Sequence, residues 1–118
     1  VLRKRLGGGW RQAGLLAAAG LYALDHNIGR LADDHAAAEA FADAVEARSP
    51  GSVKHPETNI IVLSTSGKKP ARVVAEASER GVLVSALGPK MVRAVTHLDV
   101  TLDECARAGA VLGDIIRS

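Results

Sequence analysis

Residues 82–97, VLVSALGPKMVRAVTH, decide the fold of this chain. Two apolar runs, residues 82–87 and 91–97, lie on either side of the pair Gly88-Pro89. Glycine and proline supply turn conformations, so two short apolar runs joined by them are typical of a β-hairpin. The stretch therefore predicts two adjacent antiparallel strands.

The flanking sequence predicts a third strand and three helices around this hairpin. Residues 59–63, NIIVL, form a short apolar run that is typical of a buried strand. Apolar residues recur at helical spacing over residues 30–48, and Pro70 opens another helix that Gly81 closes. Thr101 and Glu104 form a capping box, so a last helix runs from there to about residue 116.

A further helix is expected to begin at or just after Gly9, with residues 10–27 as its body. It is apolar on every side over residues 13–24, which is typical of a helix that is buried all round. A chain of 118 residues rarely encloses such a helix, so we expect a missing domain or a partner subunit to cover it. The element order is α-α-β-α-β-β-α.

The predicted fold class is α/β of the α+β kind, with a small, mainly antiparallel three-stranded sheet packed with helices. Residues 1–29 are expected to form a glycine turn and an interdomain helix, and residues 30–118 a small domain.

Composition excludes several classes of protein. The net charge of +2 is spread along the chain, which does not indicate nucleic-acid binding. Cys105 is the only cysteine and cannot form an internal disulfide, so nothing indicates an oxidising compartment. The longest apolar stretch holds 12 residues, against about 20 needed to span a bilayer. We therefore expect a cytoplasmic chain without membrane partners.

Gly7, Gly8 and Gly9 precede the first long predicted helix and indicate one candidate anion site. A glycine turn before a helix leaves backbone N–H groups at the positive end of the helix dipole. Lys4 and Arg11 lie on either side and could add charge-assisted hydrogen bonds to a phosphate. The alternative is a flexible interdomain turn with exposed charges.

Arg93 is the second candidate. Strand alternation places it on one face with Met91, Val95 and His97. An arginine in a short apolar strand is either exposed on a sheet edge or held against an anion, and its planar fork of donors suits a carboxylate. Both interpretations stay open.

The remaining polar groups favour simpler interpretations. Residues 64–69, STSGKK, resemble a lysine-bearing catalytic loop, but a polar turn with both ammonium groups in water explains them. The four histidines lack metal-ligand spacing, so no metal site is expected. Cys105 is interpreted as a small core residue of the last helix.

Four motifs together resemble one family. Residues 4–24, KRLGGGWRQAGLLAAAGLYAL, are similar to the segment that follows the cofactor-binding domain of low-specificity L-threonine aldolases. The motifs RLADDH, ETNIIV and VRAVTHLDV then occur in that family's order and spacing. Trp10 departs from the methionine expected there, a change that should leave the glycine turn intact.

The resemblance implies the carboxy-terminal part, interdomain helix plus small domain, of a fold-type-I enzyme with the aspartate-aminotransferase-like fold. Such enzymes use pyridoxal 5′-phosphate to cleave β-hydroxy-amino acids such as L-threonine to glycine and an aldehyde. The resemblance also implies that Arg93 binds the substrate α-carboxylate. Basic residues and glycines at the turn would reach the cofactor phosphate or a neighbouring subunit: Lys4, Gly7, Gly8, Gly9 and Arg11. His97 and Asp99 are expected to be structural.

The family's Schiff-base lysine lies in a serine-lysine-glycine context that no lysine of this chain shares. We therefore expect the 118-residue chain alone to bind no cofactor covalently and to be inactive. Its expected partners are a missing N-terminal cofactor domain, a neighbouring subunit in a homo-oligomer, and an amino-acid substrate. The alternatives are a non-catalytic remnant that acts as an interaction module, and the small domain of a sibling lyase or aminotransferase that uses the same cofactor.

Overall fold

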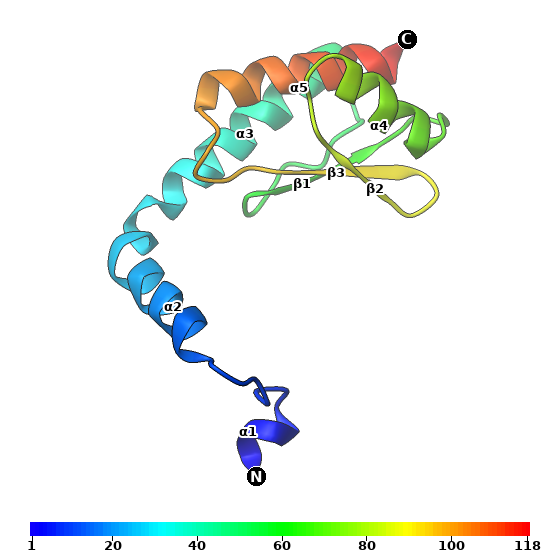
Figure 1. The fold of residues 1–118 in the computed structure, drawn as a ribbon. Coiled ribbons are helices and arrows are strands. Elements are labelled where there is room, and N and C mark those ends of the chain that lie inside the picture. The colour runs from blue at the N-terminus through cyan, green and yellow to red at the C-terminus, as the bar shows by residue number, and fades with distance from the viewer. The chain divides into compact units, whose positions relative to one another are not determined.

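A computed structural model describes all 118 residues of the chain, which divide into two compact units, Val1–Leu31 and Ala32–Ser118. The second unit contains most of α3 (Leu31–Arg48) and all of β1 (Ile60–Ser64), α4 (Pro70–Glu79), β2 (Ser85–Leu87), β3 (Met91–Val95) and α5 (Leu102–Arg117). The three strands form one antiparallel sheet in the order β1-β3-β2. All three helices lie on the same side of this sheet (Figure 1). The predicted fold class and the predicted hairpin are confirmed.

The strand register separates a buried face of the sheet from an open one. Ile61 lies opposite Ala94 and Leu63 opposite Val92, and all four side chains are buried beneath the helices. The alternate positions of β1 and β3 face away from the helices, and those on β3 are exposed. Because side chains alternate between faces, this second set forms the open face. We define it by its eight residues: Ile60, Val62, Ser64, Ser85, Leu87, Met91, Arg93 and Val95.

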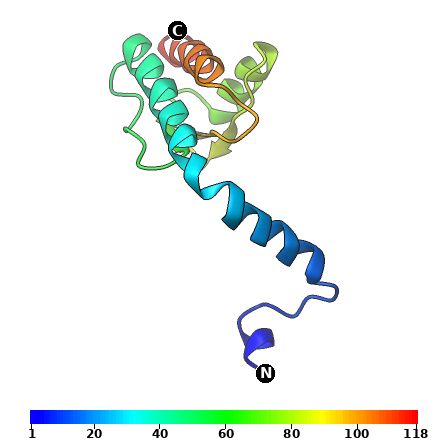
Figure 2. The ribbon, with the colours of Figure 1, turned by 90° about the vertical axis from the view of Figure 1, so that its left-hand side faces the viewer.

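Close packing of α3 against α5 forms much of the core, and the two helices run side by side (Figure 2). A Cβ atom added to Gly109 would lie 2.2 Å from the Phe41 carbonyl oxygen, which no real contact allows. Glycine at this position lets the two backbones approach closely. Around the crossing, Ala38, Val45 and Leu112 are completely buried.

Local sequence signals set several element boundaries as predicted. Pro70 begins α4, and the helix ends at Glu79, two residues before Gly81. At the start of α5, the Thr101 hydroxyl accepts a hydrogen bond from the Glu104 N–H, and the Glu104 carboxylate accepts one from the Thr101 N–H at 2.9 Å. The predicted capping box is confirmed.

The second predicted strand is shorter than expected, since β2 begins at Ser85 and not at Val82. The Val82 N–H donates to the Ala77 carbonyl oxygen at 2.9 Å, which ties this part of the chain to the end of α4. Residues 82–84 therefore follow the helix terminus and do not extend the ladder with β3.

The first unit contains α1 (Leu2–Arg5), α2 (Gly14–His26) and a short 3-10 helix, Ile28–Arg30. The predicted start of the long helix near Gly9 is wrong. Gln12 adopts a left-handed backbone conformation, with φ of 47°, and the α-helix can form only after it. Within this chain α2 buries none of its residues, and Leu15 is 83% exposed. No helix of the chain is both long and apolar enough to cross a bilayer.

Candidate functional site

Arg93 lies at the middle of β3, the central strand of the sheet, and its side chain is exposed on the open face. The expectation that an exposed Arg93 would lie on a sheet edge is wrong, because β1 and β2 pair with β3 on both sides. The guanidinium forms no ion pair and no side-chain hydrogen bond, although the side chains around it come from three strands. It is therefore an exposed positive charge without a partner, carried by the central strand of the sheet.

The surroundings of Arg93 on the open face are mostly apolar. Across the sheet it lies opposite Val62 on β1 and Ser85 on β2. Along β3 it lies between Met91 and Val95, which are 40% and 45% exposed. An arginine is costly to desolvate without an anionic partner, so a group that covered this face would need to bring one. The arrangement suits a small carboxylate held by the guanidinium fork.

The glycine turn of the first unit differs from the expected anion site. The Gly7 N–H donates to the Lys4 carbonyl oxygen at 3.2 Å, and the Gly8 N–H donates to the Arg3 carbonyl oxygen at 2.8 Å. Gly7 has a φ of 81°, the left-handed conformation that ends a helix. The turn therefore closes the carboxy-terminal end of α1, and two of the expected N–H groups are already used.

Lys4 and Arg11 are the parts of that candidate site that keep free donors. Both side chains are exposed and form no ion pair in the structure. Gly9 lies between them, and its N–H is not bonded to α1. Any contribution of this segment to anion binding therefore rests on two flexible cations and one backbone donor, without the end of a helix dipole, because α2 begins only at Gly14.

Lys68 corrects the expectation that both ammonium groups of residues 64–69 lie in water. Its Nζ donates to the Ile115 carbonyl oxygen at 2.5 Å and to the Ser118 hydroxyl at 2.8 Å. These acceptors lie at the carboxy-terminal end of α5, where carbonyl groups lack helical partners and the dipole is negative. Lys68 therefore connects the turn after β1 to α5, a structural role.

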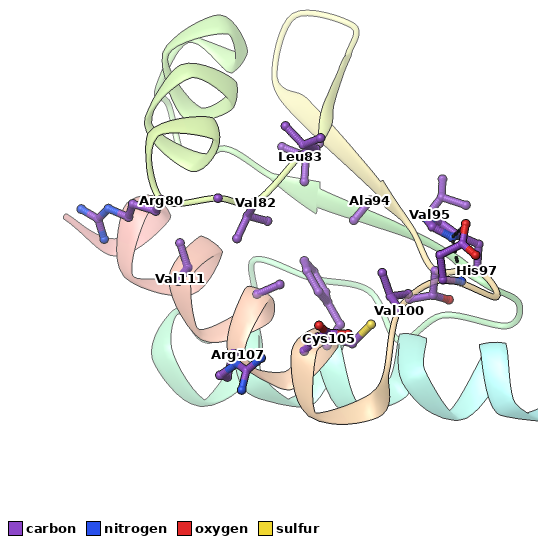
Figure 3. Close-up of a pocket in the computed structure, with 17 residues that line it drawn as sticks. Arg80, Val82, Leu83, Ala94, Val95, His97, Val100, Cys105, Arg107 and Val111 are labelled. Atoms are coloured by element: carbon purple, nitrogen blue, oxygen red, sulfur yellow. Dashed lines mark hydrogen bonds and ion pairs between the residues drawn. The ribbon is translucent and has the colours of Figure 1, made fainter.

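A cavity of about 630 Å³ opens between residues 82–84, the end of β3 and α5. Its walls include Val82, Ala94, Val100 and Val111, and the labelled Arg80 and Arg107 side chains extend away from it (Figure 3). No lysine lines it. The cavity is therefore a mainly apolar extension of the core, and the polar residues His97, Asp99 and Glu104 also contribute to its lining.

Cys105 lies in the wall of this cavity and is 5% exposed, as expected for a core residue. Burial raises the pKa of its thiol, and the neighbouring Glu104 carboxylate raises it further. A raised pKa keeps the thiol protonated and poorly nucleophilic. Nowhere in the chain do three or more His, Cys, Asp or Glu side chains lie together as a metal ion would need.

His97 and Asp99 lie in the turn between β3 and α5. The Asp99 N–H donates to Nδ1 of His97 at 3.3 Å, and the Val100 N–H donates to the His97 carbonyl oxygen at 3.2 Å. Both contacts are local and lead the chain into the Thr101 cap.

Ser85 is the residue near Arg93 that the sequence analysis missed. Counting outward from the Gly88-Pro89 turn pairs Leu87 with Met91 and Ser85 with Arg93, which the observed register shows. The sequence of the hairpin therefore contains enough information to pair Ser85 with Arg93, once the register is counted from the turn. The bonds of Lys68 had no local signal, because its partners lie 47 and 50 positions away.

Comparison with known proteins links this chain to one group of enzymes. The model of the family Beta-eliminating lyase matches residues 1–68. The low-specificity L-threonine aldolase of Escherichia coli strain K12 is 39% identical over 108 residues, which cover 92% of this chain and 32% of that protein. The probable low-specificity L-threonine aldolase of Schizosaccharomyces pombe is 33% identical over 115 residues, which cover 98% of this chain and 28% of that protein.

A plant relative gives the same result. The probable low-specificity L-threonine aldolase 2 of Arabidopsis thaliana is 38% identical over 106 residues, 85% of this chain and 30% of that protein. The chain thus spans about a third of the length of the curated relatives it matches.

Proposed function

The chain belongs to the beta-eliminating lyase family, and on that premise we propose that it forms the carboxy-terminal part of a threonine-aldolase-like lyase. The proposed reaction cleaves β-hydroxy-amino acids to glycine and an aldehyde. Residues 1–29 would supply the interdomain segment and residues 30–118 the small domain. The relatives support this assignment, because the likeness extends over most of the chain.

Arg93 carries the proposal. It presents an unpaired guanidinium at the centre of the open face, within a mostly apolar surrounding. A substrate α-carboxylate would satisfy this charge, and the rigid central strand would hold the substrate in a fixed orientation. Fixed orientation matters in this reaction, because the bond to be broken must be aligned with the group that accepts its electrons.

Pyridoxal 5′-phosphate is the cofactor proposed for the intact enzyme, where it supplies an electron sink for the electrons left on Cα. The residues of this chain fit only the margin of such a site. Lys68 is hydrogen-bonded to the end of α5, and no lysine lines the apolar cavity. We therefore propose that another segment of the enzyme, in the same or a neighbouring subunit, holds the cofactor. Lys4, Gly9 and Arg11 would approach its phosphate.

The exposed apolar surface of α2 favours one alternative, an interaction module without catalysis. Leu15 and Leu24 are 83% and 64% exposed, and the opposite sides of the helix are equally apolar. Sizing the purified chain by light scattering tests this alternative. A monomer at high concentration would count against both self-association and the proposed need for a covering partner.

A fusion enzyme tests the role of Arg93. The full chain is joined to the Escherichia coli aldolase in place of the region it matches, and threonine cleavage is measured. Arg93→Ala is expected to raise KM for L-threonine by about ten- to a hundredfold, because a hydrogen bond to a charged group contributes about 1.5–3 kcal/mol. Arg93→Lys keeps the charge without the fork and should recover only part of the loss.

Arg107→Ala is the matched control, since it removes the same charge from the exposed side of α5. It should leave KM within about twofold. An Arg93→Ala enzyme with normal KM would remove Arg93 from the substrate site. Separately, borohydride treatment of the isolated chain with pyridoxal phosphate should trap no lysine adduct, and a trapped adduct together with threonine cleavage would overturn the proposed division of the site.

A further inference from the structure

We propose that the Ser85 hydroxyl is a second donor to the carboxylate that Arg93 binds, and that it orients this carboxylate toward β2. The inference rests on the proposed function, because it needs Arg93 to bind a carboxylate. It adds a positioning and specificity contact from a different strand of the sheet.

The strand register places Ser85 beside Arg93. The two residues are direct partners across the β2–β3 ladder, so their side chains lie on the same face. Directly opposite residues of an antiparallel pair have Cβ atoms about 4.5–5.5 Å apart. The Arg93 side chain is long and exposed, so a ligand oxygen held by its guanidinium would come within reach of the Ser85 hydroxyl when that side chain lies along the sheet toward β2.

The Ser85 hydroxyl is free to take a new partner. It is exposed, and its one hydrogen bond goes to the Arg93 carbonyl oxygen at 3.5 Å. That distance is beyond the usual range for a hydroxyl donor, so the bond is weak. Rotation about χ1 would redirect the hydroxyl proton from this carbonyl toward a ligand on the open face.

The two sides of Arg93 differ in chemistry. On β2 its partner is Ser85, whereas on β1 its partner is Val62, which offers no donor. The other hydroxyl of the open face belongs to Ser64, which lies opposite Met91 and accepts a hydrogen bond from the Ser66 N–H at 3.3 Å. Only Ser85 is both adjacent to Arg93 and available as a donor.

A carboxylate offers about four acceptor positions, and a guanidinium fork takes two of them. One more donor on a single side would hold the carboxylate plane in one rotation about the Arg93 fork. An amide in its place has only one acceptor oxygen and no negative charge, so it cannot satisfy the Arg93 fork and Ser85 together. Ser85 would therefore contribute to selection of a free α-carboxylate.

The fusion enzyme described above tests the inference, with glycine and glycinamide as competing ligands. Ser85→Ala is expected to raise KM for L-threonine and the inhibition constant of glycine by about tenfold. The value of kcat and the inhibition constant of glycinamide should change by less than about twofold. Ser64→Ala, on the same face but not beside Arg93, should change none of these quantities.

A second pair of variants isolates the hydroxyl from packing. Ser85→Thr retains the hydroxyl and should keep the original KM, whereas Ser85→Val, which has the shape of that threonine without the hydroxyl, should match the loss in Ser85→Ala. Equal KM values for the Ser85→Thr and Ser85→Val enzymes would overturn the inference. An equal increase in the inhibition constants of glycine and glycinamide in Ser85→Ala would overturn it as well. If Arg93→Ala raises KM while the Ser85 variants do not, the proposed function stands and the inference fails. If Arg93→Ala leaves KM unchanged, both fail.

Discussion

Two helices of this chain, α2 and α5, are both rich in apolar residues and yet differ completely in burial. In α5 the buried residues recur on one side, at Cys105, Gly109, Leu112 and Ile116, and charged residues occupy the other side. In α2 apolar residues occupy every side, and none is buried. The more apolar helix is thus the one that contributes nothing to a core within this chain.

The difference shows that the apolar residues of a helix set how much surface it can bury. Whether that surface is buried depends on a neighbouring element that packs against it. The unit Ala32–Ser118 supplies that surface for α5, in the form of α3, α4 and the sheet. The unit Val1–Leu31 has no element with a buried residue. The stability of Val1–Leu31 is therefore expected to depend on a partner. The stability of Ala32–Ser118 is expected to come from its own core.

Shortening a leucine in each helix gives the largest expected contrast. Leu112→Ala leaves a cavity in the core and should lower the free energy of unfolding by about 2–5 kcal/mol. Leu16→Ala in α2 removes exposed atoms and should change it by less than about 0.5 kcal/mol. Urea unfolding of the isolated chain, followed by circular dichroism, measures both. A large loss for Leu16→Ala would mean that α2 is packed against another copy in solution.

A smaller contrast comes from adding one methyl group to a glycine of each helix. Gly109→Ala would place Cβ against the Phe41 carbonyl oxygen and force α3 and α5 apart, which should cost about 1–3 kcal/mol or more. Gly20→Ala in α2 meets no atom within 4 Å and should raise helix content, because alanine is the better helix former. Thermal unfolding and helix content are the measurements. Equal effects of the two substitutions would contradict the close packing of α3 and α5.

The smallest predicted effect concerns the cap of α5, for which α2 has no counterpart. Hydrogen bonds from the backbone and side chain of Thr101 lower the pKa of the Glu104 carboxyl. A carboxyl whose pKa is lower in the folded state stabilises the fold at pH values above its unfolded-state pKa of about 4.3. This contribution is lost as the pH falls through the folded-state pKa.

Thr101→Ala should lower the free energy of unfolding by about 1 kcal/mol near neutral pH. Glu104→Gln should flatten the loss of stability between about pH 5 and pH 3, because the titrating group is gone. Urea midpoints across this pH range provide the comparison. An unchanged pH profile in Glu104→Gln would assign the acid sensitivity to other carboxylates.

Much of the second unit was predictable, because its signals are local. Pro70, the Gly88-Pro89 turn and the Thr101–Glu104 capping box each act within a few residues. The predicted start of α2 is wrong for a similar reason: a run of glycines before an apolar helix is typical of a helix entrance, but here Gly7 and Gly8 close α1 through hydrogen bonds to the Lys4 and Arg3 carbonyl oxygens. A four-residue helix carries too little periodicity to be recognised.

The candidate site was predictable only residue by residue. Alternation placed Arg93 on a face with Met91 and Val95, and the family resemblance assigned it a carboxylate. The sequence did not reveal that β3 would be the central strand, with Val62 on one side of Arg93 and Ser85 on the other. Pairing with β1 joins residues about 30 positions apart, and no local pattern encodes which edge of the hairpin receives the third strand.

The sequence by itself therefore determined the element types of the small domain, the hairpin and the family. Turn residues, caps and periodicity act over a few positions of the backbone, so a linear reading captures them. Tertiary structure alone decided the open face around Arg93, the contact of Lys68 with the end of α5 and the close approach at Gly109. Each depends on atoms far apart in the chain, which packing brings together only when the whole unit has folded.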